Sequence, residues 1–280
     1  MLTSVDQGRN MMPVYIMSPM MRCGTNHLAD ILLLHPDFQL PKVMEEDFVF
    51  EHAHLLNEYA EKTYQRWTRL KWIENPEEWR RLLRLHLGQG MFSFLASQID
   101  DHKRPLFKTP DSNNIDKMFL FFPGVKLLLL MRDGRDVVES AVRKWPNQTD
   151  EYWMQRWAEG ARRILDFSQE VGREPRGTSW ELIRYEDLVE RPEAVVKRVL
   201  EFLDINGSAF KWDKLPQLPV RGSSTILDAQ GRVSQEAVEK PNDFSPVGRW
   251  QRWSVWRKRK FKKVAGRELI ELGYESNGRW

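Results

Sequence analysis

The chain has 280 residues, of which 41% are hydrophobic and 30% are charged, and its formal net charge is +3. This composition excludes a wholly disordered chain, and the length suits one large α/β domain. The single cysteine excludes an internal disulfide and a cysteine-cluster metal site, and the mild positive charge suits an anionic ligand.

The first predicted unit is a strand, a tight turn and a helix, which together span residues 14–35. Residues 14–17 are an apolar run, and Leu28, Ile31 and Leu32 recur at helical spacing. The N–H groups at the start of such a helix lack intrahelical partners, and the helix dipole favours an anion there. We therefore expect a phosphate-binding loop between this strand and this helix.

The loop lacks one residue that nucleoside triphosphate-binding loops require. Those loops have Lys after their last glycine, whereas Thr25 follows Gly24 here, and Pro19 takes the place of the first glycine. A kinase that depends on Mg²⁺ is therefore disfavoured, and a donor with a single 5′-phosphate ester fits better. Arg22 and Asn26 would add side-chain donors to such a phosphate.

Helices are predicted next in the chain, at 51–62, 76–99 and 115–122. The second of them opens with Pro76, which suits the first position of a helix, and carries apolar residues at helical spacing. The first two helices would form an insertion between the first helix of the fold and its second long strand.

A second candidate phosphate site follows the apolar run 126–131, which predicts a central parallel strand. Arg132 comes at the carboxyl end of this strand, where open α/β sheets bind ligands, and Asp133 can cap the next helix. Ser140 lies on that helix, so a guanidinium and a hydroxyl can hold one phosphate together. A charged helix start with i,i+4 ion pairs would explain the same residues without a ligand.

The second half of the chain is predicted to be mainly helical, with one long loop. Helices are expected at 150–171 and 191–203, and a strand ends in the run 183–188. Residues 204–250 are rich in Gly, Pro, Ser and Asp, and a loop of that length in a compact domain is usually functional. The segment 249–263 carries many basic residues and no acid, with tryptophans interleaved.

Several of these motifs resemble those of the sulfotransferases that use 3′-phosphoadenosine-5′-phosphosulfate (PAPS). The run R-C-G-T-N at 22–26 is similar to their 5′-phosphosulfate loop, and R-D-G-R-D-V-V-E-S at 132–140 is similar to their 3′-phosphate segment. Y-E-D-L at 185–188 and G-R-W at 248–250 also resemble this family, in particular its bacterial, carbohydrate and tyrosylprotein members. The resemblance implies a single P-loop-like α/β domain over 1–280, with a mostly parallel sheet and helices on both faces.

The resemblance also implies PAPS as the donor, its product 3′,5′-adenosine bisphosphate (PAP), and no metal. The residues that it assigns to donor binding lie in these motifs: Arg22, Cys23, Gly24, Thr25, Asn26, His27, Arg132, Ser140, Tyr185, Gly248 and Arg249. One family contact to the 3′-phosphate has no match, because this chain has Asp243, Phe244 and Ser245 where many members have Arg-Lys-Gly. We expect Lys240, Ser245 or Arg249 to replace it.

Three catalytic side chains are implied by the same resemblance. Lys108, in the run F-K-T-P, and Arg22 would lie near the transferring sulfuryl group. Glu45, in the run M-E-E-D-F, would be the general base, and Glu46 is the alternative because the acidic run leaves the register open by one residue. A solvated helix cap is another interpretation of residues 45–47.

Two segments are expected to surround the two substrates. A helical insertion at about 48–102 would line the acceptor cleft, and the loop at about 204–250 would cover the donor. The acceptor would offer a hydroxyl or an amine on a small molecule, a glycan or a peptide, and the sequence does not separate these classes or predict an oligomeric state.

The basic C-terminal segment supports a second interpretation, a non-catalytic protein that binds nucleotides or nucleic acid. Basic residues with interleaved aromatics bind nucleic acid or anionic membranes, whereas an amphipathic helix packed on the domain would need no partner. We expect the enzyme without a specific nucleic-acid partner, and leave peripheral membrane contact open. No signal peptide or transmembrane run is recognised, so a cytoplasmic location is expected.

Overall fold

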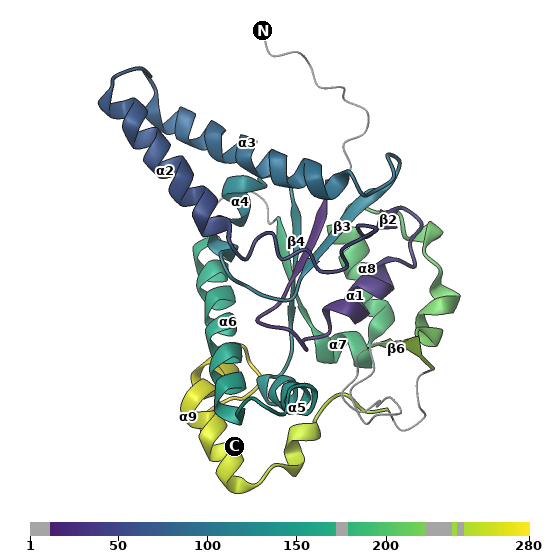
Figure 1. Ribbon diagram of the computed structural model, residues 1–280. Coiled ribbons are helices and arrows are strands. Elements are labelled where there is room, and N and C mark those ends of the chain that lie inside the picture. Colours follow the sequence, from purple (N-terminus) through teal and green to yellow (C-terminus); the bar gives the residue numbers. More distant parts are fainter. Residues whose placement is uncertain (1–11, 172–178, 222–236, 240–243) are drawn as a thin grey trace.

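The computed structural model describes residues 12–171, 179–221, 237–239 and 244–280, and its centre is a parallel five-stranded sheet (Figure 1). The strands lie in the order β2-β3-β1-β4-β5, and every neighbouring pair is parallel. Their bounds are β1 Val14–Met17, β2 Phe38–Gln39, β3 Arg104–Thr109, β4 Lys126–Met131 and β5 Trp180–Arg184. The predicted α/β fold with a mostly parallel sheet is confirmed.

The central strands are buried on both faces, and their alternate side chains divide the hydrophobic core into two. Tyr15 and Met17 of β1 belong to one cluster, whereas Val14 and Ile16 belong to the other. β4 is divided in the same way. This double burial explains why both strands are continuous apolar runs in the sequence, without polar alternation.

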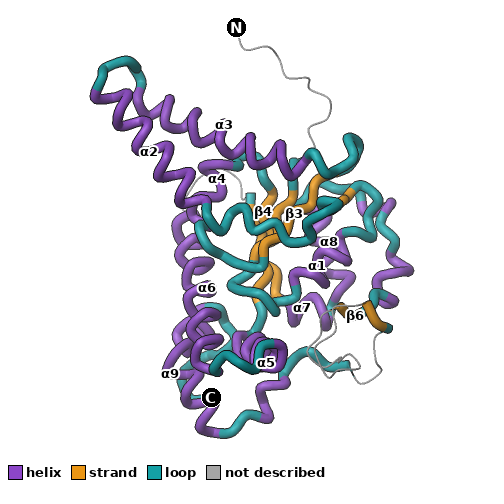
Figure 2. The backbone as a smooth tube through the Cα atoms, in the orientation of Figure 1, coloured by secondary structure: helices purple, strands orange, loops and turns teal. Residues whose placement is uncertain are grey.

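Helices cover the two faces, as Figure 2 shows by the purple segments around the orange strands. One face carries α1 Thr25–Leu32, α7 Tyr185–Glu190 and α8 Pro192–Phe202, whose buried residues share one cluster. The other carries α4 Met118–Phe121, α5 Gly134–Lys144, α6 Asp150–Val171 and α9 Val255–Glu271. The predicted helix at 150–171 is confirmed with the same bounds, and that at 191–203 is confirmed within one residue at each end.

A long hairpin of two helices projects from this body (Figure 1). It consists of α2 Ala53–Arg69 and α3 Pro76–Ala96, between β2 and β3 in the chain. Its buried residues lie near its base, Ala53 and Ala60 in α2 and Gly88 and Leu95 in α3. The hairpin therefore attaches through its base, and α2 continues seven residues beyond the predicted end at residue 62.

The C-terminal helix starts later than its basic sequence suggests. Ser254 has an extended backbone, and its hydroxyl accepts a hydrogen bond from the Arg257 N–H at 3.3 Å, so α9 begins at Val255. Trp253 precedes the helix and is buried, whereas Trp256 is 77% exposed. The tryptophans of this segment therefore do not form one stripe.

Short elements complete the described chain. β6 Val220–Arg221 and β7 Ala237–Val238 form an antiparallel pair, and 3₁₀ helices span Ile115–Lys117, Gly207–Ala209, Trp212–Gln217 and Arg249–Arg252. Because β1, β3, β4 and β5 are parallel, the loops after their carboxyl ends meet at one edge of the sheet. That edge holds both sequence motifs that predicted phosphate binding.

Candidate active site

The phosphate loop connects β1 to α1 and has an unusual backbone at its end. Gly24 has φ of 100°, and Arg22 has φ of 78°, a left-handed value that a side chain rarely adopts. A Cβ at Gly24 would collide with the ring of Tyr185. Glycine is therefore required at this position both by its backbone angle and by the aromatic ring packed against it.

Helix α6 supports the same loop from behind. A Cβ at Gly160 would overlap the carbonyl of Pro19, so helix and loop are in backbone contact. A Cβ at Gly134, the first residue of α5, would likewise overlap the ring of Trp157. The loop and the start of α5 are thus held by glycine-dependent packing on one helix.

A cavity of about 360 Å³ lies against this loop. Its polar end is lined by the phosphate loop, α5 and the 3₁₀ helix at 249–252, with the residues Arg22, Thr25, Arg132, Ser140, Lys144 and Arg249. Its other end is mainly apolar and includes Leu188, Val189, Leu215, Leu218 and Pro219. One end of the cavity suits anionic groups and the other a flat apolar group.

Three arginines meet at the polar end. Burial, together with Arg132 and Arg249, lowers the pKa of Arg22 to about 10, and burial with Arg132 lowers that of Arg249 to about 10. These guanidinium groups remain charged at neutral pH, so their mutual repulsion disfavours the empty cavity and favours an anion in it. The Nε of Arg22 donates to Ser140 Oγ at 3.0 Å.

Arg132 is almost fully buried and holds the neighbouring segments. Its Nη1 donates to the carbonyl of Arg22 at 2.9 Å and its Nη2 to that of Pro246 at 2.6 Å. Its guanidinium lies 4.4 Å from the centre of the Tyr185 ring. Its Nε is buried and has no hydrogen-bond partner among the described residues.

Tyr185 lines the cavity between the phosphate loop and Arg132, both of which it contacts. Its ring contacts Gly24 and Arg132, and its centre lies 6.2 Å from that of His27 in an edge-on arrangement. Burial raises the pKa of the Tyr185 phenol, so it is neutral at physiological pH. A neutral aromatic ring at this place is suited to stacking or packing against a flat ligand.

Lys108 of β3 lies beneath the polar end and is 1% exposed. Its ammonium donates to Asn26 Oδ1 and lies 3.6 Å from a carboxylate oxygen of Glu46. Burial lowers the pKa of Lys108, while Glu46 acts in the opposite direction. Lys108 itself is not among the residues that line the cavity, but it contacts two that are, Asn26 and Glu46.

Asp47 fixes the acidic segment against β3. Its amide donates to the Lys108 carbonyl at 3.2 Å, and its carboxylate accepts from the Lys108 amide at 3.2 Å and the Thr109 hydroxyl at 3.0 Å. The Tyr15 hydroxyl also donates to it. Asp47 is therefore a positioning residue, and its bonds determine where its neighbours point.

The two candidate bases face different surroundings. Glu46 lines the cavity and is paired with Lys108. The Glu45 side chain is 63% exposed, lies 3.4 Å from an Nη of Arg221, and is not among the residues that line the cavity. The geometry favours Glu46, the sequence-based alternative, over Glu45.

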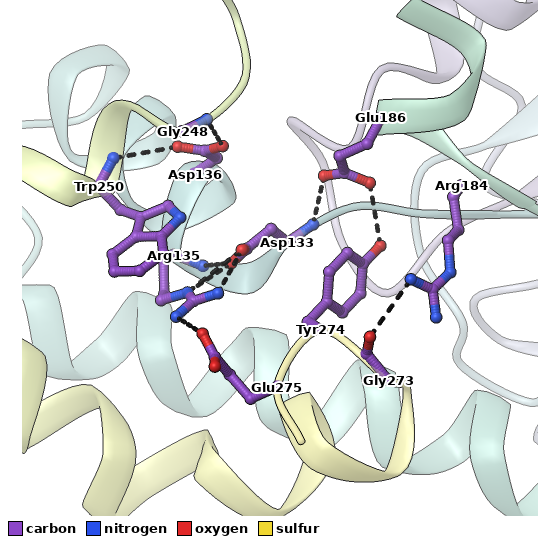
Figure 3. A network of polar contacts seen from close by, with 10 residues as sticks. All are labelled: Asp133, Arg135, Asp136, Arg184, Glu186, Gly248, Trp250, Gly273, Tyr274 and Glu275. Carbon is purple, nitrogen blue, oxygen red and sulfur yellow. Dashed lines mark hydrogen bonds and ion pairs between the residues drawn. The ribbon is translucent and has the colours of Figure 1, made fainter. Parts of the chain in front are cut away.

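Other charged residues from the motifs at 132–140 and 185–188 form a structural network with residues near the C-terminus (Figure 3). The Asp133 amide donates to Glu186 at 2.9 Å, and the Tyr274 hydroxyl donates to the same carboxylate at 3.2 Å. Arg135 pairs with Asp133 and Glu275. These contacts tie the start of α5 to α7 and to the segment after α9.

Asp136 links α5 to the segment that carries Arg249. Its buried carboxylate accepts from the amides of Gly248 at 2.6 Å and Trp250 at 3.1 Å (Figure 3). Burial raises its pKa, and these bonds and Arg132 act against that rise. Asp136 therefore positions the 3₁₀ helix whose first residue, Arg249, enters the cavity.

The structure brings most of the predicted donor residues to one cavity. Those that line it are Arg22, Gly24, Thr25, Asn26, His27, Arg132, Ser140, Tyr185 and Arg249. Cys23 does not: its side chain is buried in the core, where burial raises the pKa of the thiol to about 12. Gly248 lies behind the cavity as a turn residue with φ of 77°.

Of the candidates for the unmatched 3′-phosphate contact, one lines the cavity. Arg249 does so, whereas the Ser245 hydroxyl is directed to the Val247 carbonyl at 3.4 Å. Lys240 lies outside the described residues. Lys144 also lines the cavity and was missed, although its place one helical turn after Ser140 is a signal in the sequence.

Comparison with known sequences relates most of the chain to one family. A family model described as the sulfotransferase family matches residues 13–208. The chain is 26% identical over 270 residues to protein-tyrosine sulfotransferase A of Caenorhabditis elegans, and 22% identical over 248 residues to protein-tyrosine sulfotransferase of Drosophila melanogaster. The alignments cover 89% and 85% of this chain but only 64% and 47% of these relatives.

Solved structures show the same fold. The sulfotransferase domain from the curacin biosynthetic pathway is similar with a TM-score of 0.55 and 18% identity, over 94% of this chain and 98% of that one. The sulfotransferase domain of the Synechococcus PCC 7002 olefin synthase is similar with a TM-score of 0.53 and 17% identity, over 94% and 97% of the two chains. The likeness in fold therefore extends well beyond the residues that the family model matches.

Proposed function

The chain belongs to the sulfotransferase family, and on this basis we propose that it transfers a sulfuryl group from PAPS to a hydroxyl or amine. The observation that carries this proposal is the convergence of Arg22, Arg132 and Arg249 in one cavity beside a phosphate loop. A donor with phosphates at both its 5′ and 3′ positions offers the negative charge that this cluster requires.

We assign the 3′-phosphate to Arg132, Ser140, Arg249 and Lys144. The convergence of these side chains on one cavity supports this assignment, since guanidinium groups bind phosphate through paired hydrogen bonds. The start of α1 would receive the 5′-phosphosulfate. The adenine would lie toward the apolar end of the cavity, beside Tyr185.

The segments that surround the donor support the single-domain arrangement expected from the sequence. Phe244 and Pro246, together with residues 215–216 and 218–221, line the cavity and come from the loop proposed to cover the donor. The insertion that includes α2 and α3 is proposed to line the acceptor side, which Glu46 and Lys108 approach.

Transfer would be an in-line displacement at sulfur. A bond forms between the acceptor oxygen and sulfur while the bond from sulfur to the bridging oxygen of the phosphate breaks, and PAP leaves with that electron pair. Arg22 and the N–H groups of the loop would stabilise the charge that develops on the bridging oxygen. Lys108 would act at the same place, through its hydrogen-bonded position beside Asn26.

Glu46 is our proposed general base. It lines the cavity, and its carboxylate lies 3.6 Å from the Lys108 ammonium, on the side where the acceptor's proton would be taken. Asp47, one residue later, is occupied by three hydrogen-bond donors besides the backbone of Val49, and burial raises its pKa. Asp47 therefore positions the segment, and Glu46 is the carboxylate that would take the acceptor's proton.

A metal-dependent kinase is less well supported, because Thr25 stands where the phosphate-binding Lys of such enzymes would be. Non-catalytic nucleic-acid binding does not explain an arginine cluster inside a cavity that also has an apolar end. Two named relatives are protein-tyrosine sulfotransferases, so a tyrosine peptide is the acceptor to test before glycans and small phenols.

Isothermal titration calorimetry with PAP, 5′-AMP and ATP–Mg²⁺ tests the donor assignment. We expect metal-independent binding of PAP that exceeds binding of 5′-AMP by roughly tenfold or more, the value of one charged hydrogen bond. Equal binding of PAP and 5′-AMP, or preference for ATP–Mg²⁺, would refute the assignment.

A further inference from the structure

The outer face of α9 carries exposed side chains that sulfuryl transfer does not use. Three of them are apolar, with exposed fractions of 63% for Val255, 77% for Trp256 and 38% for Ile270. The others are basic and exposed: Arg259, Lys260, Lys263 and Arg267. None of these seven residues is among those that line the donor cavity.

These residues lie on one face of the helix. At 100° per residue, they fall within roughly 140° of its circumference, and α9 is roughly 25 Å long. The opposite face carries Phe261, Ala265 and Leu269, which are buried in the core. In Figure 1, α9 lies at the edge of the molecule beside α6, which leaves its outer face open.

The face keeps positive charge after its ion pairs are counted. Lys260 pairs with Glu151 at 2.8 Å, and Arg267 pairs with Glu271 at 2.6 Å. Among the described residues, no carboxylate lies within ion-pair distance of Arg259 or Lys263. Lys263 nevertheless contributes to the lowered pKa of Glu151, so the face combines two cations outside direct ion pairs, one of them partly offset by Glu151, with an unusually exposed tryptophan.

We propose that this face of α9 docks on an anionic lipid surface. Such a surface accepts all the side chains of the face: its headgroups attract the cations, and its interface accommodates tryptophan and small apolar groups. Nucleic acid would pair with the cations but would leave Val255 and Ile270 in water. The contact is peripheral, because no helix among the described residues is long and apolar enough to cross a membrane.

Flotation with lipid vesicles tests the proposal on the full chain. We expect the protein to float with vesicles of equimolar phosphatidylcholine and phosphatidylglycerol, and not with phosphatidylcholine alone. The double variant Arg259→Glu/Lys263→Glu should lower the partition coefficient roughly tenfold or more. Trp256→Ala should lower it several-fold, and salt should weaken binding by the wild type.

Matched controls come from the helical hairpin. Arg66→Glu/Arg69→Glu in α2 makes the same change in net charge at exposed positions, and Trp72→Ala removes a tryptophan that is 73% exposed. Both controls should float like the wild type, and all variants should keep the Kd for PAP. Failure of the wild type to float, or an equal loss in the controls, would overturn the proposal. So would binding to a random oligonucleotide that requires Arg259 and Lys263 while vesicles do not bind.

Discussion

Two adjacent glutamates have different surroundings, and this difference is why we propose a catalytic role for only one of them. Glu46 meets a buried lysine at the edge of the cavity, while Glu45 meets Arg221 near solvent. Their chemistry is identical, so only position distinguishes them. The positions follow from Asp47, whose hydrogen bonds to β3 fix the segment.

We predict that Glu46→Gln lowers kcat for sulfuryl transfer about 10²–10⁴-fold, the usual contribution of a general base. The Kd for PAP should stay the same, because the proposed donor contacts do not involve this carboxylate. Steady-state kinetics and calorimetry on the same preparation measure the two quantities. Glu45→Gln is the matched control, and a larger loss of kcat in Glu45→Gln than in Glu46→Gln would reverse the assignment.

Arg249 is the residue on which recognition of the 3′-phosphate should most visibly depend. Arg249→Ala should weaken PAP binding roughly 10–100-fold, since a hydrogen bond to a charged group contributes about 1.5–3 kcal/mol. Binding of 5′-AMP should change little, because it lacks that phosphate. Arg252→Ala, at an exposed position of the same 3₁₀ helix, serves as the control in calorimetry. An equal loss for PAP and 5′-AMP would argue against a specific 3′-phosphate contact.

Among the elements, the 3₁₀ helix at 249–252 depends on α5 for its position. The carboxylate of Asp136 accepts hydrogen bonds from two backbone amides at the start of this helix, those of Gly248 and Trp250. The chain turns at Gly248, whose φ is positive, and this turn directs both amides to the carboxylate. Asp136, in the middle of the motif that begins at Arg132, thus supports the cavity without lining it. Its role is to bring Arg249 from a distant segment to the cavity.

Asp136→Ala should therefore affect both stability and donor binding. The loss of two charge-assisted hydrogen bonds at a buried site should lower the free energy of unfolding by about 2–3 kcal/mol. PAP should bind more weakly as well, since Arg249 is no longer held. Denaturant unfolding and calorimetry measure these effects, and Asp116→Ala, on the surface beside Lys117, is the control. Unchanged PAP binding in Asp136→Ala would separate Asp136 from the site.

The contact between α6 and α9 should depend on pH. Hydrogen bonds from Arg162 and Arg267 lower the pKa of Glu271 from 4.5 to about 2. A depressed carboxyl pKa stabilises the fold above the unfolded value, and this stabilisation is lost as pH falls from 4.5 toward 2. Glu271→Gln should lower Tm at neutral pH by about 1–2 °C, a small change because the pair is near the surface. In thermal scans, the difference in Tm between Glu271→Gln and the wild type should shrink as pH falls from 4.5 toward 2. The control Glu170→Gln, at an exposed position, should have the same Tm as the wild type throughout.

At the scale of the whole molecule, the body and the helical hairpin are separate in their packing. The two hydrophobic clusters lie on the faces of the sheet, and the hairpin contributes to them near its base. The donor cavity has no lining residue from the hairpin. We therefore expect the body to provide most of the hydrophobic core and all of the described residues that line the proposed donor cavity.

Replacement of residues 62–84 by a short Gly/Ser linker should leave Tm and the Kd for PAP close to those of the wild type. Turnover of acceptors should change, if this insertion contributes to the acceptor side as proposed. Thermal scans, calorimetry and an acceptor assay provide the three readouts. A large fall in Tm would show that the outer hairpin contributes to the core, contrary to its burial pattern.

Local patterns in the sequence predicted much of the fold and of the candidate site. The apolar runs at 14–17 and 126–131 identified the central strands, and the glycine and cap residues that follow them identified the cavity's polar end. The choice between Glu45 and Glu46 was beyond local pattern, because it depends on hydrogen bonds from Asp47 to a strand 61 residues away. The entry of Arg249 into the cavity depends on Asp136, which is more than a hundred residues earlier in the chain.

The packing of Gly134 against Trp157 has a consequence for how this sequence can vary. A Cβ at Gly134 would collide with a carbon of the Trp157 indole, so any other residue at this position would overlap the ring. The two positions should therefore covary: a side chain at position 134 requires a smaller residue than tryptophan at position 157. Each pairing would fill the same volume behind the phosphate loop. A substitution at only one of the two positions would leave either a cavity or a steric clash, and so a poorly packed protein. Ancestors that moved between the two pairings would have needed both substitutions close together in time.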